Sequence, residues 1–182
     1  MRGKHDIEVY NKRVHYFLSV RRNLTILQGD SATGKSELVR LVSQWESGGA
    51  SSGISLICDV ACAVLGPVDW EHRLLRLQGS IVFIDGHSPF VQSHRFAELA
   101  CKSDNYFIII YRDRMPYLPY DTSDVCGLRI ASQSQECHDR RRVCNEAYRL
   151  FSPSVEGAIV PEYLQHHLSA WEAKSCRDAR YP

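Results

Sequence analysis

The chain has 182 residues, of which 44% are hydrophobic and 24% charged, and its formal net charge is +1. Such values are typical of one globular domain with a buried core, and the near-zero net charge gives no evident nucleic-acid patch. No apolar run approaches the ~20 residues that cross a bilayer, and the charged start lacks the apolar segment of a secretory signal. Seven cysteines, an odd number, favour reduced thiols. We therefore expect a cytoplasmic protein that has no membrane partner.

The first 23 residues predict a β-hairpin. Two β-rich segments, residues 7–10 and 13–20, flank a turn at Asn11 and Lys12. A short apolar strand over residues 24–28 follows the hairpin and stops at Gly29.

Apolar strands alternate with amphipathic helices from residue 24 to residue 131. The predicted strands cover residues 24–28, 54–60, 80–86, 106–111 and 127–131, and the predicted helices cover residues 36–45, 68–78 and 89–103. This alternation is typical of an α/β fold, a mostly parallel sheet with helices on both faces. Residues 139–151 and 161–177 then have helical patterns. We expect a single domain over residues 1–182, with a hairpin (1–23), an α/β core (24–131) and a helical C-terminal part (132–182).

A glycine-rich segment, GDSATGKS, lies between the first core strand and the first core helix. Its two glycines let the backbone turn tightly, so that successive amides point inward and form an anion nest at a helix N-terminus. Its lysine adds a mobile cation, and its serine hydroxyl suits a metal ion bound to phosphate. The sequence therefore predicts a phosphate site made of Gly29, Asp30, Ser31, Ala32, Thr33, Gly34, Lys35 and Ser36.

This segment resembles the Walker A loop of the P-loop NTPases, and a second segment resembles their Walker B strand. That strand, IVFID, has four apolar residues and ends in Asp85. The resemblance extends from residue 24 to about residue 131. It implies a nucleotide-binding domain for ATP or another NTP, in which Ser36 and Asp85 hold Mg²⁺. No guanine-reading Asn-Lys-x-Asp segment occurs, which favours ATP.

The hairpin before the loop resembles the entry to AAA-like and ABC-type ATPases. In that branch a polar or arginine sensor follows a neighbouring strand, and Arg112 has this place. The branch also carries a glutamate after the Walker B aspartate, which polarises the attacking water. Here Gly86 and His87 stand instead, and no LSGGQ-type signature precedes Asp85.

The catalytic candidates are Lys35, Asp85, Asp59 and Arg112. Asp59 ends the strand predicted at 54–60 and is our first candidate for a carboxylate that replaces the missing glutamate, with His87 second. We expect an ATPase that is slow alone or is stimulated by a protein partner that completes its catalytic site. Two alternatives stay open: a small-molecule or nucleotide kinase, with an arginine lid at 138–142, and a non-catalytic ATP-binding switch or assembly subunit.

Overall fold

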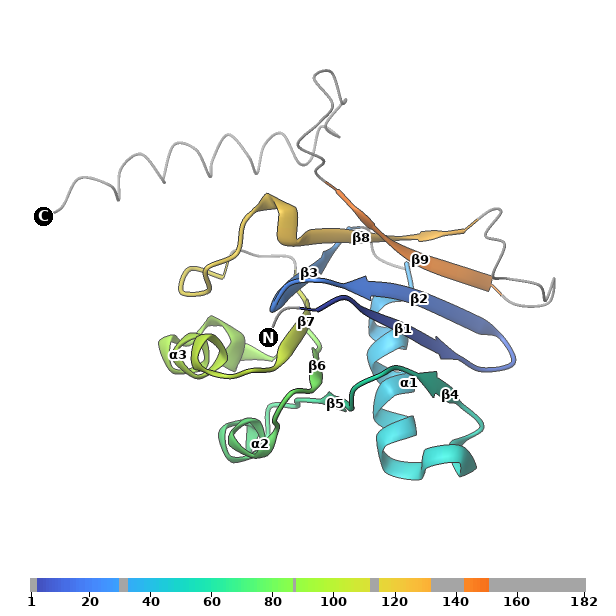
Figure 1. Cartoon of the computed structure of the whole chain (residues 1–182), viewed down its shortest axis with the longest axis horizontal. Coiled ribbons are helices and arrows are strands. Elements are labelled where there is room, and N and C mark those ends of the chain that lie inside the picture. Colours follow the sequence, from blue (N-terminus) through green and yellow to red (C-terminus); the bar gives the residue numbers. More distant parts are fainter. Residues whose placement is uncertain (1–2, 30–32, 87, 112–114, 132–142, 151–182) are drawn as a thin grey trace, which may run out of the picture. The chain divides into compact units, whose positions relative to one another are not determined.

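A mixed β-sheet dominates the fold (Figure 1). The computed structural model describes residues 3–29, 33–86, 88–111, 115–131 and 143–150, all within one unit, Met1–Phe151. The strands in these ranges are β1 (His5–Tyr10), β2 (Val14–Val20), β3 (Leu24–Gln28), β4 (Ser55–Ile57), β5 (Cys62–Val64), β6 (Ile81–Ile84), β7 (Tyr106–Ile110), β8 (Val125–Ile130) and β9 (Val143–Arg149). The α-helices are α1 (Lys35–Gly48), α2 (Trp70–Arg76) and α3 (His94–Lys102), and short 3-10 helices cover Gly49–Ser52, Pro89–Gln92 and Thr122–Asp124. None of the helices described is long and apolar enough to cross a membrane.

The strands follow the order β4-β1-β2-β9-β8-β3-β7-β6-β5. Five neighbours, β8, β3, β7, β6 and β5, run parallel. Their carboxyl ends therefore meet at one edge of the sheet, the carboxyl edge, and their amino ends at the opposite, amino edge. β9 pairs antiparallel with β8 and parallel with β2, while β1 pairs antiparallel with both β2 and β4. The whole sheet curls into a half-barrel (Figure 1).

The predicted fold class, a mostly parallel sheet with helices on both faces, is wrong. The sheet is mixed and curled, and three α-helices accompany nine strands in the described ranges. The predicted hairpin is present as β1 and β2, but it is built into the same sheet. Alternate side chains of β1, including Ile7 and Val9, are buried. A strand with one apolar face needs a core to cover that face, so the hairpin cannot stand apart from the rest.

The helix predicted over residues 139–151 is wrong where the structure describes it. Residues 143–149 form β9, which lies between β2 and β8 and pairs with both. Glu146, Ala147 and Arg149 favour a helix locally, but this preference is worth only tenths of a kcal/mol per residue. Backbone pairing on two sides outweighs it. The rest of residues 132–182, including the helix predicted at 161–177, lies outside the described residues.

The single strand predicted at 54–60 is two strands. β4 pairs antiparallel with β1, and β5 pairs parallel with β6. The sequence does not reveal the turn between them, because hydrophobic periodicity alone does not distinguish two short strands from one longer strand. The other core strands and the helices occur where the sequence predicts them, with ends that shift by a few residues.

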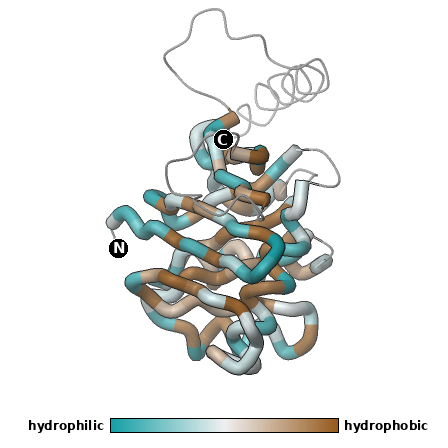
Figure 2. The backbone as a smooth tube through the Cα atoms, turned by 90° about the vertical axis from the view of Figure 1, so that its right-hand side faces the viewer, coloured by the Kyte–Doolittle hydropathy of each residue, from teal (hydrophilic) through white to brown (hydrophobic). Residues whose placement is uncertain are grey.

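Helix α1 packs against both ends of the curled sheet. It contacts β4 and β1 at one end of the strand order and β6 and β5 at the other. Its residues Leu38, Leu41 and Val42 are fully buried among side chains of these strands. α2 and α3 pack in a second cluster, with the alternate side chains of β6 and β7. Figure 2 shows hydrophobic and hydrophilic segments interspersed along the chain. Strands β6 and β7, which are packed on both faces, are buried at every residue.

Asn105 ties the start of β7 to the segment before β6. Its side chain is fully buried. Its Oδ1 accepts a hydrogen bond from the backbone N–H of Ser80 (2.9 Å), and its Nδ2 donates to the carbonyl oxygen of Leu77 (2.9 Å). One buried amide thus satisfies two backbone groups of another segment.

We expect Asn105→Ala to lower the free energy of unfolding by about 2–3 kcal/mol, since it leaves buried backbone groups without partners. Urea unfolding measures this change. Asp104→Ala is the matched control: the neighbouring carboxylate accepts one bond, from Gly79 N (3.0 Å), in an exposed position. Its loss should cost less than about 1 kcal/mol. Equal costs for the two variants would contradict the role assigned to Asn105.

Candidate nucleotide-binding site

The glycine-rich segment lies at the carboxyl edge, where β3 ends and α1 begins. Gly29 has a φ of 115° and Gly34 a φ of 83°. Both values fall in the left-handed region that favours glycine. Gly34 is the N-cap of α1, and no side chain accepts a capping hydrogen bond there. The backbone N–H groups of the first turn, together with the helix dipole, therefore favour an anion at this point.

Lys35 folds back onto this loop. Its side chain is 6% exposed, and its Nζ donates hydrogen bonds to the carbonyl oxygen of Gly29 (3.1 Å) and to Oγ1 of Thr33 (2.5 Å). A buried ammonium group requires such oxygen partners. They hold the cation against Gly29 and Thr33, beside the start of α1.

Tyr16 supports the loop from β2. Its hydroxyl donates a hydrogen bond to the carbonyl oxygen of Gly34 (2.9 Å), and a Cβ at Gly34 would lie 2.6 Å from the same hydroxyl. Burial raises the pKa of Tyr16 to about 12. Sequence reasoning missed this residue, because nothing in the pattern of the hairpin shows that β2 reaches the start of α1.

Asp85 reaches the carboxyl edge from β6. β3 and β6 both run parallel to β7, which lies between them. Asp85 therefore ends its strand at the same edge as Gly29, and Ser36 is exposed in the first turn of α1. Among the described residues, no group of three or more His, Cys, Asp or Glu side chains could hold a metal ion. One carboxylate and one hydroxyl suit Mg²⁺, which keeps several waters and binds substrate phosphates.

Gly86 makes a close approach to β7. A Cβ at this position would overlap the backbone carbonyl oxygen of Ile110. A backbone atom cannot move aside as a flexible side chain can, so the sheet accepts only glycine here. A glutamate after Asp85, which the resemblance to AAA-like and ABC-type ATPases led us to look for, is therefore excluded sterically at this position.

Asp59 does not join these groups. It lies in the turn between β4 and β5, before β5 begins, and so belongs to the amino edge. Its Oδ2 lies 2.8 Å from Nδ1 of His5, and this hydrogen bond holds the pKa of Asp59 below its usual value. His5 in turn packs edge-on against Tyr106, the first residue of β7. Asp59 thus supports the amino end of the sheet, away from the loop after β3.

The structure brings together Gly29, Thr33, Gly34, Lys35 and Ser36 in one loop, with Asp85 at the same edge. The other predicted site residues lie outside the described residues; they are Asp30, Ser31, Ala32, His87 and Arg112.

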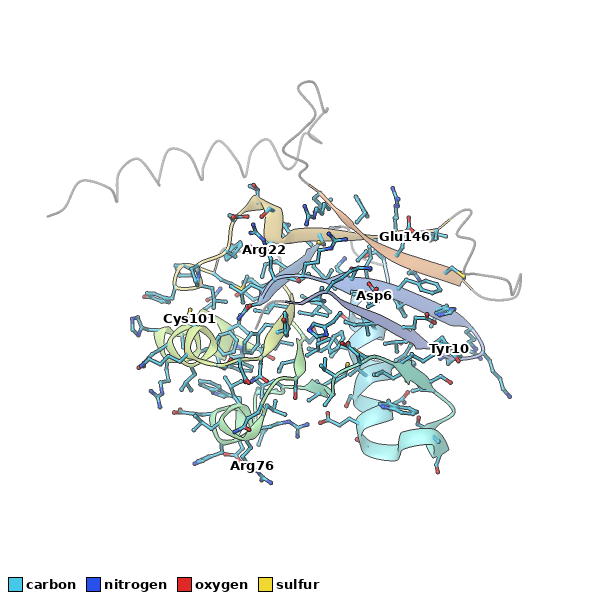
Figure 3. All side chains as sticks on the ribbon, viewed as in Figure 1. Asp6, Tyr10, Arg22, Arg76, Cys101 and Glu146 are labelled. Carbon is cyan, nitrogen blue, oxygen red and sulfur yellow. The ribbon has the colours of Figure 1, made fainter. Side chains whose placement is uncertain are left out.

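Two clefts of about 350 and 340 Å³ lie at the amino edge, and both are lined by Arg22 and Asp124. Nη1 of Arg22 pairs with Oδ1 of Asp124 (3.0 Å) and with Oδ2 of Asp121 (3.2 Å). Figure 3 shows Arg22 at the turn that leads into β3. Two carboxylates beside the guanidinium offset its charge, so Arg22 by itself is a poor anion site.

We expect Gly86→Ala to lower the free energy of unfolding by about 2–3 kcal/mol, as overpacking against backbone does. Gly66→Ala is the matched control, since nothing lies within 4 Å of a Cβ at Gly66. It should stay within about 1 kcal/mol of wild type. Chemical denaturation compares the three proteins, and a Gly86→Ala protein as stable as wild type would refute the close approach.

Tyr16→Phe should cost about 1 kcal/mol near neutral pH, the worth of a typical hydrogen bond. A tyrosine whose folded pKa lies above its unfolded value keeps its full contribution below the unfolded pKa, near 10, and loses it as pH rises to about 12. The stability difference between wild type and Tyr16→Phe should therefore fall between pH 10 and pH 12. Urea unfolding at several pH values tests this, and a flat difference would count against the burial of the hydroxyl. Tyr117→Phe, at an exposed ring, should stay within about 0.5 kcal/mol of wild type at neutral pH.

No family model matches the chain, and no curated protein is similar to it. Its function is therefore inferred from the chemistry of the loop after β3 and of the residues beside it.

Proposed function

We propose that this protein is a P-loop ATPase that binds ATP with Mg²⁺ and hydrolyses it slowly or under the control of a partner. The observation that carries the proposal is the loop between β3 and α1, with Lys35 folded onto Gly29 and Thr33. Two glycines in the left-handed region, a buried cation and an uncapped helix start converge there. Each of these features favours a phosphate chain, and together they suit the phosphates of a nucleotide.

In this proposal the backbone amides of the loop and the ammonium group of Lys35 bind the phosphates. Oγ of Ser36 and the carboxylate of Asp85 hold Mg²⁺, which neutralises charge on the β- and γ-phosphates when bound. Tyr16 fixes the carbonyl oxygen of Gly34, which leaves the N–H groups of the first turn of α1 directed at the ligand. The protein contributes positioning and electrostatic stabilisation, the main terms in phosphoryl transfer.

Slow turnover follows from Gly86. The position after Asp85 has no side chain to orient a water, and the contact with Ile110 leaves no room for one. Asp59 is bound to His5 at the amino edge, so it does not replace the missing carboxylate. A partner that supplies a carboxylate or an arginine finger would complete the site, and arginine fingers are worth ~10³–10⁵ in rate.

The same steric restriction favours a second candidate, a nucleotide-binding switch without catalysis of its own. A domain that binds ATP and cannot orient water keeps the bound state until a partner acts. Either function fits the cytoplasm expected from the sequence, where free thiols such as those of Cys58 and Cys62 stay reduced. Cys144 is disulfide-bonded, so the expectation of reduced thiols is wrong at that position. A kinase would differ from both, since it would transfer phosphate to a small acceptor.

Lys35→Ala should abolish most of the thermal stabilisation that Mg·ATP gives to the wild-type protein. A ligand that binds only the native state raises its stability by mass action, ≈ 2.7 kcal/mol at 100 times Kd. The readout is the shift of Tm on adding ligand, which is independent of any change in the Tm of the free variant. Lys102→Ala is the control, because Lys102 is an exposed lysine of α3 paired with Glu98. Equal shifts in all three proteins would overturn the phosphate role of Lys35.

The same titration is repeated with Asp85→Asn, with and without Mg²⁺. This variant should keep metal-free binding and lose the tightening that Mg²⁺ gives, since it removes one anionic oxygen ligand. Phosphate release and transfer to added acceptors are followed in parallel. Release at a rate well below the 1–100 s⁻¹ of kinases supports the slow ATPase. Binding without release supports the switch, and loss of ATP only with an acceptor supports the kinase.

A further inference from the structure

The cleft of about 340 Å³ at the amino edge has an excess of positive charge. Three arginines line it, Arg21, Arg22 and Arg149, against one carboxylate, Asp124. Arg22 is neutralised by its ion pairs with Asp124 and Asp121. Arg21 and Arg149 form no ion pair and no side-chain hydrogen bond with the residues that the structure describes. Two guanidinium groups of this cleft therefore keep their full charge.

The cleft exists because β2 and β9 part before they end. Their pairing stops at Phe17 and Glu146. β2 nevertheless continues to Val20, and β9 continues to Arg149. β9 and β8 lie between β2 and β3 in the sheet, so the turn at residues 21–23 has to cross the ends of both strands. The cleft lies between this turn and the strand ends.

Thr25, in β3, lines the cleft with an unused hydroxyl group. Its side chain is 9% exposed, and its hydroxyl has no hydrogen-bond partner in the described ranges. Within those ranges only the hydroxyl of Tyr106 is both fully enclosed and without a partner. The hydroxyl of Thr25 is therefore open to the cleft. A polar group in such a place requires a hydrogen bond, which water or a polar ligand in the cleft supplies.

Thr25 and Arg149 lie on one face of the sheet. Arg149 is the register partner of Cys126 in β8, so the two side chains point to the same side. Cys126 packs against the cluster that contains α1. Leu24 and Ile26 pack in the other cluster, so Thr25 between them points to the side of Cys126. One ligand in the cleft can therefore contact both the guanidinium and the hydroxyl.

These donors and the remaining lining suit a phosphate monoester. Guanidinium groups bind phosphate oxygens through paired, charge-assisted hydrogen bonds. A phosphate monoester carries a charge of about −1.5 to −2 at pH 7, which two unpaired guanidinium groups balance. The cleft volume lies within the range of small-molecule sites, about 300–1,000 Å³, and leaves room for an organic group. Leu24, Ala147 and Tyr148 also line the cleft and provide apolar surface for that group.

Carboxylates around the cleft disfavour an extended polyanion. Asp121 and Asp124 lie beside Arg22. Asp6 is the register partner of Ser19, which lines the cleft. A nucleic-acid backbone that ran beyond the cleft would bring further phosphates close to these negative charges. A small ligand with a single phosphate group avoids this repulsion.

We propose that this cleft binds the phosphate monoester of a small organic molecule, with Arg21 and Arg149 on the phosphate and the hydroxyl of Thr25 as a further donor. This is a second site, at the opposite edge of the sheet from the loop after β3. The inference does not depend on nucleotide binding at that loop.

Isothermal titration of the full chain with phenyl phosphate tests the site, and thermal melts verify that each variant is folded. Arg21→Gln and Arg149→Gln should each weaken binding about tenfold, the loss expected for one charge-assisted hydrogen bond. Arg76→Gln is the matched control and should leave the affinity unchanged. Arg76 is an exposed arginine of α2 that also lacks an ion pair with the described residues, and Figure 3 shows it well apart from Arg22.

Two further titrations separate this site from the loop after β3 and the phosphate from its organic group. Lys35→Ala should bind phenyl phosphate as tightly as wild type does, because Lys35 does not line the cleft. Inorganic phosphate should bind more weakly than phenyl phosphate, because it lacks a ring to contact the apolar lining.

Thr25→Val distinguishes a binding role from a structural one. The substitution replaces a hydroxyl that has no protein partner by a methyl group of similar shape, so the free energy of unfolding should not fall. The affinity for phenyl phosphate should fall severalfold, since one donor to the phosphate is lost. A residue with a purely structural role would lose stability and keep its affinity.

Several results would contradict the proposal. Equal affinities in wild type, Arg21→Gln and Arg149→Gln would remove the arginines from the site, and full affinity in Thr25→Val would remove the hydroxyl. Binding that disappears in folded Lys35→Ala would assign phenyl phosphate to the loop after β3. Equal affinity for inorganic phosphate would exclude a role for the organic group. A single-stranded oligonucleotide that binds more tightly through the same two arginines would identify a polyanion site instead.

Discussion

The burial of the Lys35 ammonium group is the constraint on which the candidate site depends. A cation with 6% of its surface exposed must have oxygen partners in fixed places, and the loop supplies them through Gly29 and Thr33. The carbonyl group of Gly29 can reach Lys35 only because the backbone turns through a positive φ there. The cation and the described ends of the loop, Gly29 and Thr33, therefore determine each other's positions without a bound ligand. Preorganisation of this kind reduces the free energy that binding must spend on ordering.

The curled sheet positions the two ends of the loop, at β3 and at α1. Helix α1 carries the lysine, and the sheet contacts this helix from both ends of its strand order. β2 adds a specific bond, from the hydroxyl of Tyr16 to the carbonyl oxygen of Gly34. The antiparallel strands thus do more than extend the sheet, because they bury the face of α1 that a flat parallel sheet would leave in water. The packing that forms the half-barrel thus also positions the site at the carboxyl edge.

Much of the candidate site could be predicted from the sequence, because its signals are local. The spacing of Gly29, Gly34 and Lys35 requires a strand before it and a helix after it, and both are present as β3 and α1. The apolar runs of β6 and β7 could also be predicted, since buried parallel strands are continuous in hydrophobicity.

The curl could not be predicted, because it depends on which strands pair, and pairing joins segments far apart in the chain. β9 has a local preference for a helix and adopts a strand by pairing with β2, far away in the chain, and with β8, the strand before it. The position of Asp59 differs from the prediction for the same reason: one turn between β4 and β5 moves it from the expected edge to the other.

The contact between Gly86 and the carbonyl oxygen of Ile110 also bears on how such a chain could evolve. Every glycine codon becomes an aspartate or a glutamate codon through one base change, so a carboxylate after Asp85 is genetically close. The sheet nevertheless excludes this carboxylate sterically, because the new side chain would have to push two neighbouring strands apart. If the chain is the ATPase proposed above, a lineage under selection for faster turnover would therefore find its carboxylate on another segment or on another protein. Dependence on a partner would then be a property inherited with the spacing of β6 and β7, and it would persist however strongly the chain itself were selected for speed.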